Sequence, residues 1–141
     1  MFQNVKFDGE INYPDSFNIR DYARNLRNLG LVIDIESFPN SALSRQQVFD
    51  YVTESSNTLL NSCVLICAWG GMNRQHCYSV FNSWLEWKSI AESILSGAMS
   101  REDAYAAFAG LRENKKLPGM GPAYFTKLIY FLSQPSNRGY I

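Results

Sequence analysis

Most hydrophobic positions in the chain recur at the spacing of one face of an α-helix. This spacing predicts helices within residues 19–29, 44–52, 59–67, 76–95, 100–111 and 122–132. Two of them begin with a capping pair, Ser44 with Gln47 and Ser100 with Asp103. Three are expected to end at Gly30, Gly97 and Pro135. Residues 59–67 are almost entirely apolar, so we expect them to form the central buried helix.

Two segments show a different pattern. Residues 1–13 alternate apolar and polar positions on both sides of Asp8-Gly9, which is typical of a small β-hairpin. Residues 31–38 also alternate, but Pro39-Asn40 ends them quickly, so a strand and an irregular segment both remain open. The predicted fold is therefore mainly α: a single helical domain over residues 1–141 with a small N-terminal β-hairpin.

Length and composition narrow the class of protein. A chain of 141 residues suits one domain, and its 46% hydrophobic and 14% aromatic content excludes global disorder. No apolar run is long enough to span a bilayer, and the N-terminus lacks the apolar core of a signal peptide. Cys63, Cys67 and Cys77 then indicate reduced thiols, because three cysteines cannot all pair within one chain. We therefore expect a cytoplasmic protein with no membrane partner.

Charge is distributed unevenly along the chain. Lysine and arginine together number 13, and so do aspartate and glutamate, which makes the formal net charge zero. Residues 112–141 nevertheless contain five basic residues and one acidic residue, whereas residues 1–111 contain eight and twelve. A local basic segment can bind a polyanion even in a neutral chain. The alternative interpretation is a solvated basic tail.

The basic segment contains the sequence Leu117-Pro-Gly-Met-Gly-Pro122, which joins two predicted helices with almost no loop. The two glycines allow a sharp turn and a close approach of a ligand to the backbone, because they carry no Cβ atom. Free amides and the positive dipole end of the next helix would point out of this turn, a geometry that binds phosphate. Lys115 and Lys116 add electrostatic attraction. An ordinary tight helix–helix turn is the alternative.

This turn followed by an apolar helix resembles the helix-hairpin-helix of the DNA glycosylase superfamily, whose members excise damaged bases. Residues 119–132 and 138–141 are similar to a bacterial branch related to 8-oxoguanine DNA glycosylases, some of which resemble accessory components of anti-phage defence operons. The resemblance implies a helix-hairpin-helix over about residues 101–133. It also implies that DNA is held through main-chain amides, here those of Gly119, Met120 and Gly121. Family members often add a monovalent cation bound by main-chain carbonyls, and no other cofactor is expected.

The resemblance further implies a nucleophilic lysine early in the second hairpin helix, whose amine attacks the sugar C1′ and forms a Schiff base. This sequence has Ala123 at the usual position. The nearest amine is Lys127, which lies four residues later and therefore on the same helical face. Its apolar neighbours would lower its pKa from about 10.4 toward neutrality if the side chain is buried. The alternative is that Lys127 contacts a phosphate or only solvent.

The family also uses an aspartate, which stabilises the charge that develops at C1′ and helps to activate the nucleophile. Its position, counted from Ala123, falls just past Ile141. We therefore expect either that the chain lacks the final family segment or that the protein is a binding form without the chemistry. An upstream acid could replace the aspartate only if the fold brings it beside Lys127. The acids considered are Asp34, Glu86 and Glu92.

An extruded base needs a pocket with flat faces and hydrogen-bonding groups. The candidates lie around the polar loop after residues 59–67 and on the second hairpin helix; they are Trp69, Asn73, Gln75, His76 and Tyr124. The alternative is that the tryptophan belongs to the core and that the loop is a simple helix connection. The cysteines and the single histidine lack the spacing of a metal site, so we predict no bound metal.

Three functions are consistent with these observations. The first is a DNA base-excision glycosylase that binds the DNA backbone at the hairpin and uses Lys127 as its nucleophile or as an electrostatic group. The second is a DNA-binding module of the same fold without catalysis. The third is a protein-interaction component of a bacterial defence or repair system, in which an aromatic surface meets a protein partner.

Overall fold

The computed structural model describes residues 19–133, and within this range the chain is mainly helical and contains no β-strand. The α-helices are α1 (Ile19–Arg24), α2 (Arg45–Thr53), α3 (Leu59–Trp69), α4 (Arg74–Asn82), α5 (Trp84–Ser96), α6 (Arg101–Glu113) and α7 (Pro122–Leu132). Two short 3₁₀ turns, η1 (Arg27–Leu29) and η2 (Ile35–Ser37), lie between α1 and α2. The mainly α class is therefore confirmed. The expected hairpin at residues 1–13 and the helix end at Pro135 lie outside the described residues.

Local capping residues set several element ends as predicted, but the helix expected over residues 19–29 ends at Arg24, and only the 3₁₀ turn η1 continues to Gly30. The two capping pairs form at the starts of α2 and α6, which are Ser44 with Gln47 and Ser100 with Asp103. Gly30 and Gly97 follow η1 and α5 in the left-handed conformation, which glycine adopts without steric cost. Among the described helices, none combines the length and the apolar character that a bilayer crossing requires.

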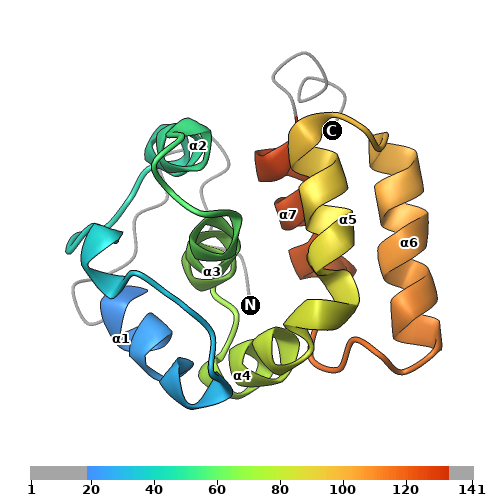
Figure 1. Ribbon diagram of the computed structural model, residues 1–141, viewed down its shortest axis with the longest axis horizontal. Coiled ribbons are helices and arrows are strands. Elements are labelled where there is room, and N and C mark those ends of the chain that lie inside the picture. The colour runs from blue at the N-terminus through green and yellow to red at the C-terminus, as the bar shows by residue number, and fades with distance from the viewer. Residues whose placement is uncertain (1–18, 134–141) are drawn as a thin grey trace, which may run out of the picture.

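Helices α3 and α7 lie at the centre of the domain. α3 packs against α1, α2 and α7, while α7 also contacts α2, α5 and α6. In Figure 1, α1–α3 form one side and α5–α7 the other, with α4 at the base between them. Every residue of α3 from Asn61 to Trp69 is buried, as expected for the central helix. α3 and α7 are therefore neighbours in the core.

The prediction of a single helix over residues 76–95 is wrong, because the helix is interrupted at Ser83, between α4 and α5. The Ser83 amide donates to the Val80 carbonyl at 3.2 Å, and the Trp87 indole N–H donates to the same carbonyl at 2.9 Å. Trp87 is fully buried in this arrangement. The break thus directs the tryptophan into the core, and neither glycine nor proline marks it in the sequence.

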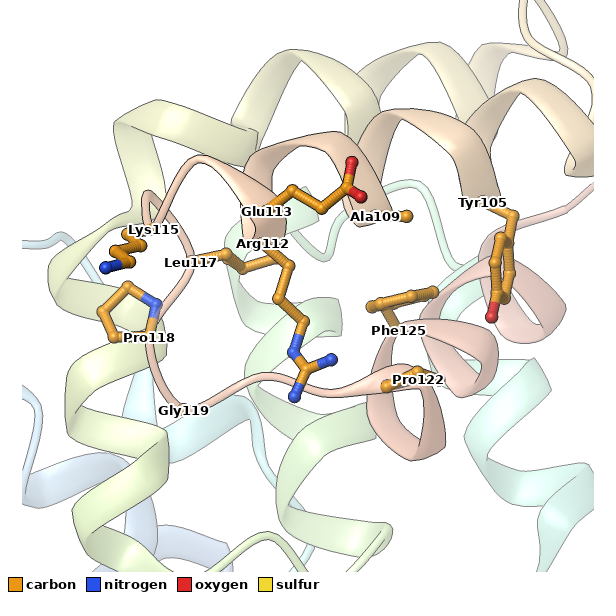
Figure 2. A pocket seen from close by; sticks show the side chains of 10 residues that line it. All are labelled: Tyr105, Ala109, Arg112, Glu113, Lys115, Leu117, Pro118, Gly119, Pro122 and Phe125. Carbon is orange, nitrogen blue, oxygen red and sulfur yellow. The ribbon is translucent and has the colours of Figure 1, made fainter.

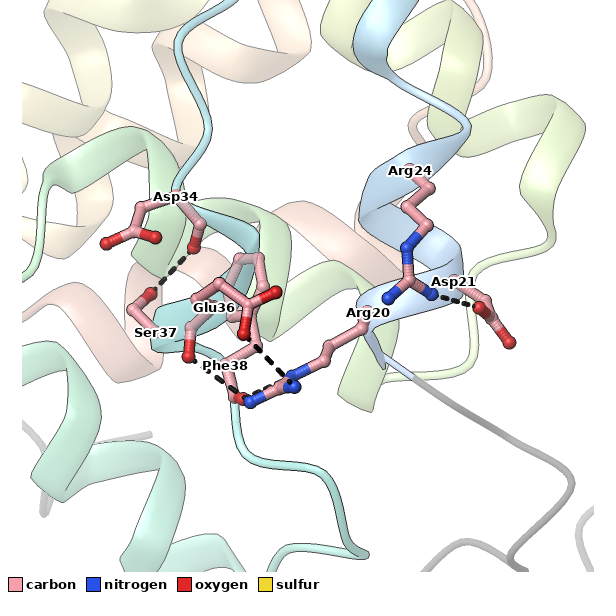
Figure 3. A network of polar contacts seen from close by, with 7 residues as sticks. All are labelled: Arg20, Asp21, Arg24, Asp34, Glu36, Ser37 and Phe38. Atoms are coloured by element: carbon pink, nitrogen blue, oxygen red, sulfur yellow. Dashed lines mark hydrogen bonds and ion pairs between the residues drawn. The ribbon is translucent and has the colours of Figure 1, made fainter.

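Residues 31–38 contain η2 and no strand. Arg20 of α1 donates to the carbonyls of Phe38 at 2.9 Å and Glu36 at 3.2 Å, and its guanidinium lies 3.6 Å from the Glu36 carboxylate (Figure 3). The buried Asn61 side chain accepts the Asp34 amide at 3.1 Å and donates to the Asp34 carbonyl at 2.9 Å. Side chains from α1 and α3 therefore satisfy backbone groups that a partner strand would otherwise satisfy.

Helix α6 ends in a Schellman motif just before the glycine turn. The Lys115 amide donates to the Arg112 carbonyl at 3.0 Å, and the Lys116 amide donates to the Leu111 carbonyl at 2.9 Å. Lys115 occupies the left-handed position with a φ of 60°, a position that glycine usually fills. The chain therefore leaves α6 sharply and turns back toward α7.

Candidate functional site

The Leu117–Gly121 turn connects α6 to α7 and rests on the start of α4. Gly119 has a φ of 88°, and a Cβ atom there would lie 3.0 Å from the His76 carbonyl oxygen. Both the backbone conformation and the space therefore require glycine. Gly121 differs, because its backbone is extended and a Cβ atom would come no closer than 3.8 Å to the Arg112 guanidinium. The missing side chain at Gly121 thus leaves open space above the backbone.

The main-chain donors of this turn differ in part from the expected set. The Met120 amide donates to the Leu117 carbonyl at 3.5 Å, and the Met120 side chain is buried. The amides of Gly119, Gly121 and Ala123 donate to no acceptor within residues 19–133. The donors left for a ligand therefore flank Met120, at the N-terminus of α7, where the helix dipole favours an anion.

Positive side chains surround the turn. Lys115 and Lys116 precede it on the exposed surface, and Arg112 of α6 reaches toward Gly121. None of the three cations forms an ion pair with another described residue. The turn therefore combines uncompensated positive charge with available amides, an arrangement that attracts phosphate groups.

Lys127 lies on α7 with its amine folded back onto the helix. Its Nζ donates to the Ala123 carbonyl at 2.9 Å and lies 5.2 Å from the centroid of the Tyr124 ring. Burial lowers the pKa of this amine, while the neighbouring Cys67 acts to a smaller extent in the opposite direction. Lys127 forms no ion pair with any residue between 19 and 133. A lowered pKa increases the fraction of the amine that is neutral at a given pH, and the neutral amine is the nucleophilic form.

The end of α3 provides the space for this lysine. A Cβ atom on Gly70 would lie 2.9 Å from the Lys127 Cδ and 3.4 Å from its Cε. The Tyr124 hydroxyl donates to the Gly71 carbonyl at 3.3 Å, which ties α7 to the same loop. The fold therefore brings Lys127 and Tyr124 together with the loop after α3. This spacing role of Gly70 was not predicted from the sequence.

The other residues proposed for a base pocket do not all lie together. The Trp69 indole N–H donates to the Leu43 carbonyl at 2.9 Å, and its ring packs edge-on against a phenylalanine of α7. Trp69 is thus a core residue without an open face, which corrects the expectation that it stacks on a base. Gln75 and His76 are exposed on the first turn of α4, and Asn73 caps that helix by accepting the His76 amide at 2.8 Å.

No described carboxylate lies beside Lys127. Burial and Cys67 cause its pKa shift, and no acidic side chain contributes. Asp34 immediately precedes η2, where its backbone bonds to Asn61 of α3, and Glu86 and Glu92 are exposed on α5. Within residues 19–133 the fold therefore brings none of these acids beside Lys127 to replace the family aspartate.

The three cysteines are buried free thiols. Burial raises the pKa of the Cys63 and Cys67 thiols and raises that of Cys77 to about 12. These thiols remain protonated at neutral pH, whereas a metal binds the thiolate. In the part of the chain that the structure describes, no three His, Cys, Asp or Glu side chains are grouped closely enough to hold a metal ion.

A groove of about 580 Å³ opens between α6 and the start of α7 (Figure 2). Tyr105 and Phe125 line one end, Lys115 lines the other, and the Arg112 side chain lies between them. Neither Tyr105 nor the Arg112 side chain was predicted from the sequence as a site residue. Their separation by seven positions, which places them on one face of α6, was the signal that could have found them.

A comparison with protein families gives the class of the protein. The family described as "Putative 8-oxoguanine DNA glycosylase OGG-like protein" matches residues 16–141, which is most of the chain. Together with the helical fold, this match defines a glycosylase-like protein. The chain belongs to this family of OGG-like proteins. No curated protein and no solved structure matches it. The resemblance inferred from the turn is therefore confirmed at the level of the family.

Proposed function

We propose that the protein is a DNA base-excision glycosylase that removes an oxidised purine, with Lys127 as its nucleophile. The observation that carries this proposal is the state of the Lys127 amine, which is partly buried, lowered in pKa and without an ion-pair partner among the described residues. Family membership favours 8-oxoguanine as the base and DNA repair as the role.

The neutral amine attacks C1′ of the damaged nucleotide. A bond forms between Nζ and C1′ while the N-glycosidic bond breaks, and the base leaves with that electron pair and takes up the proton lost from the amine. The hydrogen bond to Ala123 occupies one N–H and leaves the amine lone pair for attack. The sugar ring of the adduct then opens to an imine, which borohydride reduces to a stable secondary amine.

The DNA backbone lies on the Leu117–Gly121 turn in this proposal. The available amides of the turn and the exposed Lys115 and Lys116 support contact with phosphate. The carbonyls of Pro118, Gly119 and Met120 accept no hydrogen bond from residues 19–133. Oxygen atoms of this type fit a monovalent cation, which would add positive charge beside the phosphate.

Borohydride trapping tests the proposal. The substrates are a duplex that contains 8-oxoguanine and the same duplex with an abasic site. We expect a covalent adduct with the wild type and with Lys88→Ala, a control lysine exposed on α5, and none with Lys127→Ala. Base release is measured in parallel, because a hydrolytic glycosylase forms no Schiff base. A wild type that yields neither adduct nor free base overturns the proposal.

A second candidate is a DNA-binding protein of the same fold without catalysis. One observation favours it: no described carboxylate stands beside Lys127 to stabilise charge at C1′. Binding to duplex DNA that weakens steeply with salt, without adduct or base release, would support this candidate over the enzyme.

A further inference from the structure

The groove between α6 and α7 contains an aromatic face that the proposed reaction does not use. Tyr105 is 44% exposed, and its ring meets Phe125 edge-on, with centroids 5.0 Å apart and planes at 75°. Phe125 in turn stacks on Phe108 at 5.3 Å with planes at 10°. Buried rings therefore hold the tyrosine in one orientation while part of its surface remains in solvent (Figure 2). A fixed, partly exposed ring of this kind is a stacking platform for a base.

Positive charge also lines the same groove. The Arg112 side chain extends toward the segment before α7 (Figure 2), and its guanidinium would lie 3.8 Å from a Cβ atom on Gly121. Neither Arg112 nor Lys115 forms an ion pair with a described residue, and the same holds for Glu113, the carboxylate that lines the groove. The lining thus carries two cations against one anion, which favours an anionic ligand.

The groove is separate from the Lys127 site but continuous with the glycine turn. Phe125 lines the groove, and Lys127 follows it by two positions, which is about 200° around α7. The amine and the groove therefore lie on different faces of the helix. Gly119, which lies within the turn, and Pro122, which follows it, both line the groove, and the Gly119 amide is one of those available to phosphate. A strand that contacts the turn therefore passes the mouth of the groove.

We propose that this groove binds one unstacked nucleotide of single-stranded DNA, with the base against Tyr105 and the phosphate at Arg112. The groove volume of about 580 Å³ is in the range of small-ligand sites, which is about 300–1,000 Å³. The lining matches the two parts of a nucleotide, because it offers an aromatic ring to the base and a cation to the phosphate. The inference rests on the proposed function only in taking nucleic acid as the ligand class.

Binding of a fluorescent hexathymidylate tests the groove, with a blunt hairpin duplex as the second ligand. Tyr105→Leu retains an apolar side chain on α6 but removes the flat ring, and Tyr105→Phe retains the ring. We expect Tyr105→Leu to weaken hexathymidylate binding about tenfold, as for loss of one base–aromatic stack, and to leave duplex binding unchanged. Tyr105→Phe should bind like the wild type. Arg112→Gln should weaken hexathymidylate binding and reduce its salt slope by about one.

The outcomes distinguish a failure of the groove proposal from a failure of the proposed glycosylase activity. The proposal is overturned if folded Tyr105→Leu binds hexathymidylate as tightly as the wild type does. It is also overturned if the wild type does not bind hexathymidylate. Binding of thymidine monophosphate as tight as that of hexathymidylate also overturns it, because the ligand is then a free nucleotide. Borohydride trapping on the abasic duplex, measured on the same preparations, tests Lys127 alone and does not depend on Tyr105.

Discussion

The missing side chain of Gly70 provides the space that the Lys127 side chain occupies. A Cβ atom on Gly70 would lie 2.9 Å from the Lys127 Cδ, which is closer than two carbon atoms approach without a shift. The Gly70 backbone itself is ordinary, with φ −72° and ψ −5°. The glycine is therefore required by its neighbour and not by its own conformation.

The substitution Gly70→Ala should displace the lysine and leave the fold intact. The obstructing atom belongs to a flexible side chain, so we expect the free energy of unfolding to change by at most about 1 kcal/mol. The rate of borohydride trapping should fall by at least about tenfold, because the amine loses its position relative to C1′. Gly110→Ala is the matched control: no atom lies within 4 Å of its new Cβ, and it should stabilise α6 by about 0.5–1 kcal/mol. Equal trapping rates in both variants would contradict the positioning role.

The two glycines of the turn should respond differently to substitution. Gly119→Ala combines a left-handed backbone with a Cβ atom 3.0 Å from the His76 carbonyl, so it should lower the free energy of unfolding by about 1–3 kcal/mol. Gly121→Val fits the extended backbone and should change stability by only about 0.5 kcal/mol. It should still weaken duplex binding, because the side chain fills the space that a phosphate approaches. Denaturant unfolding and fluorescence anisotropy measure the two effects, and unchanged DNA affinity in Gly121→Val would remove the proposed role of the turn.

The pH dependence of trapping should report the lowered pKa of Lys127. Burial disfavours the charged amine, so its pKa in the folded protein lies below the ordinary value of 10.5. The trapping rate should rise with pH and reach a plateau below pH 10.5. Between the lowered pKa and 10.5 the unfolded chain binds more protons than the folded chain, so stability should also rise with pH across that window. Lys127→Met should abolish this rise in denaturant titrations; a rise of the same size in both proteins would assign it to another group.

The left-handed backbone of Lys115 should lower the stability of the fold, while its charged side chain should contribute to DNA binding. Lys115→Gly relieves a conformation that a β-carbon disfavours, so we expect the free energy of unfolding to increase by about 1 kcal/mol. Lys115→Ala removes the same charge but keeps the β-carbon, and its stability should stay close to that of the wild type. Both variants should lose the same affinity for duplex DNA if the ammonium contacts phosphate. Thermal unfolding and salt titrations of binding distinguish the two contributions.

Predictions from sequence succeeded where the deciding interactions are local. The capping box of Ser44 with Gln47 and the start of α7 at Pro122 each depend on a few adjacent residues, and both formed as expected. The break at Ser83 was missed because the Trp87 bond to the Val80 carbonyl leaves no glycine or proline signal in the chain.

The candidate site shows the same division. Lys127 and the glycine turn were proposed as site residues from one contiguous stretch of the sequence, and this remains a prediction. The space left by Gly70 and the groove beside Tyr105 depend on packing between helices that are distant in sequence, so neither follows from one segment alone. Trp69 was placed wrongly for a related reason, since its position beside the loop gave no indication that its indole turns toward Leu43.

The turn packs closely against the start of α4, where Gly119 lies beside His76. His76 is the only histidine in the chain, and its side chain is exposed. Any ligand that displaces the turn must also disturb the first residues of α4. A single imidazole signal in a proton spectrum is therefore an intrinsic reporter of occupancy at this surface, and it requires no label on the protein or on the nucleic acid.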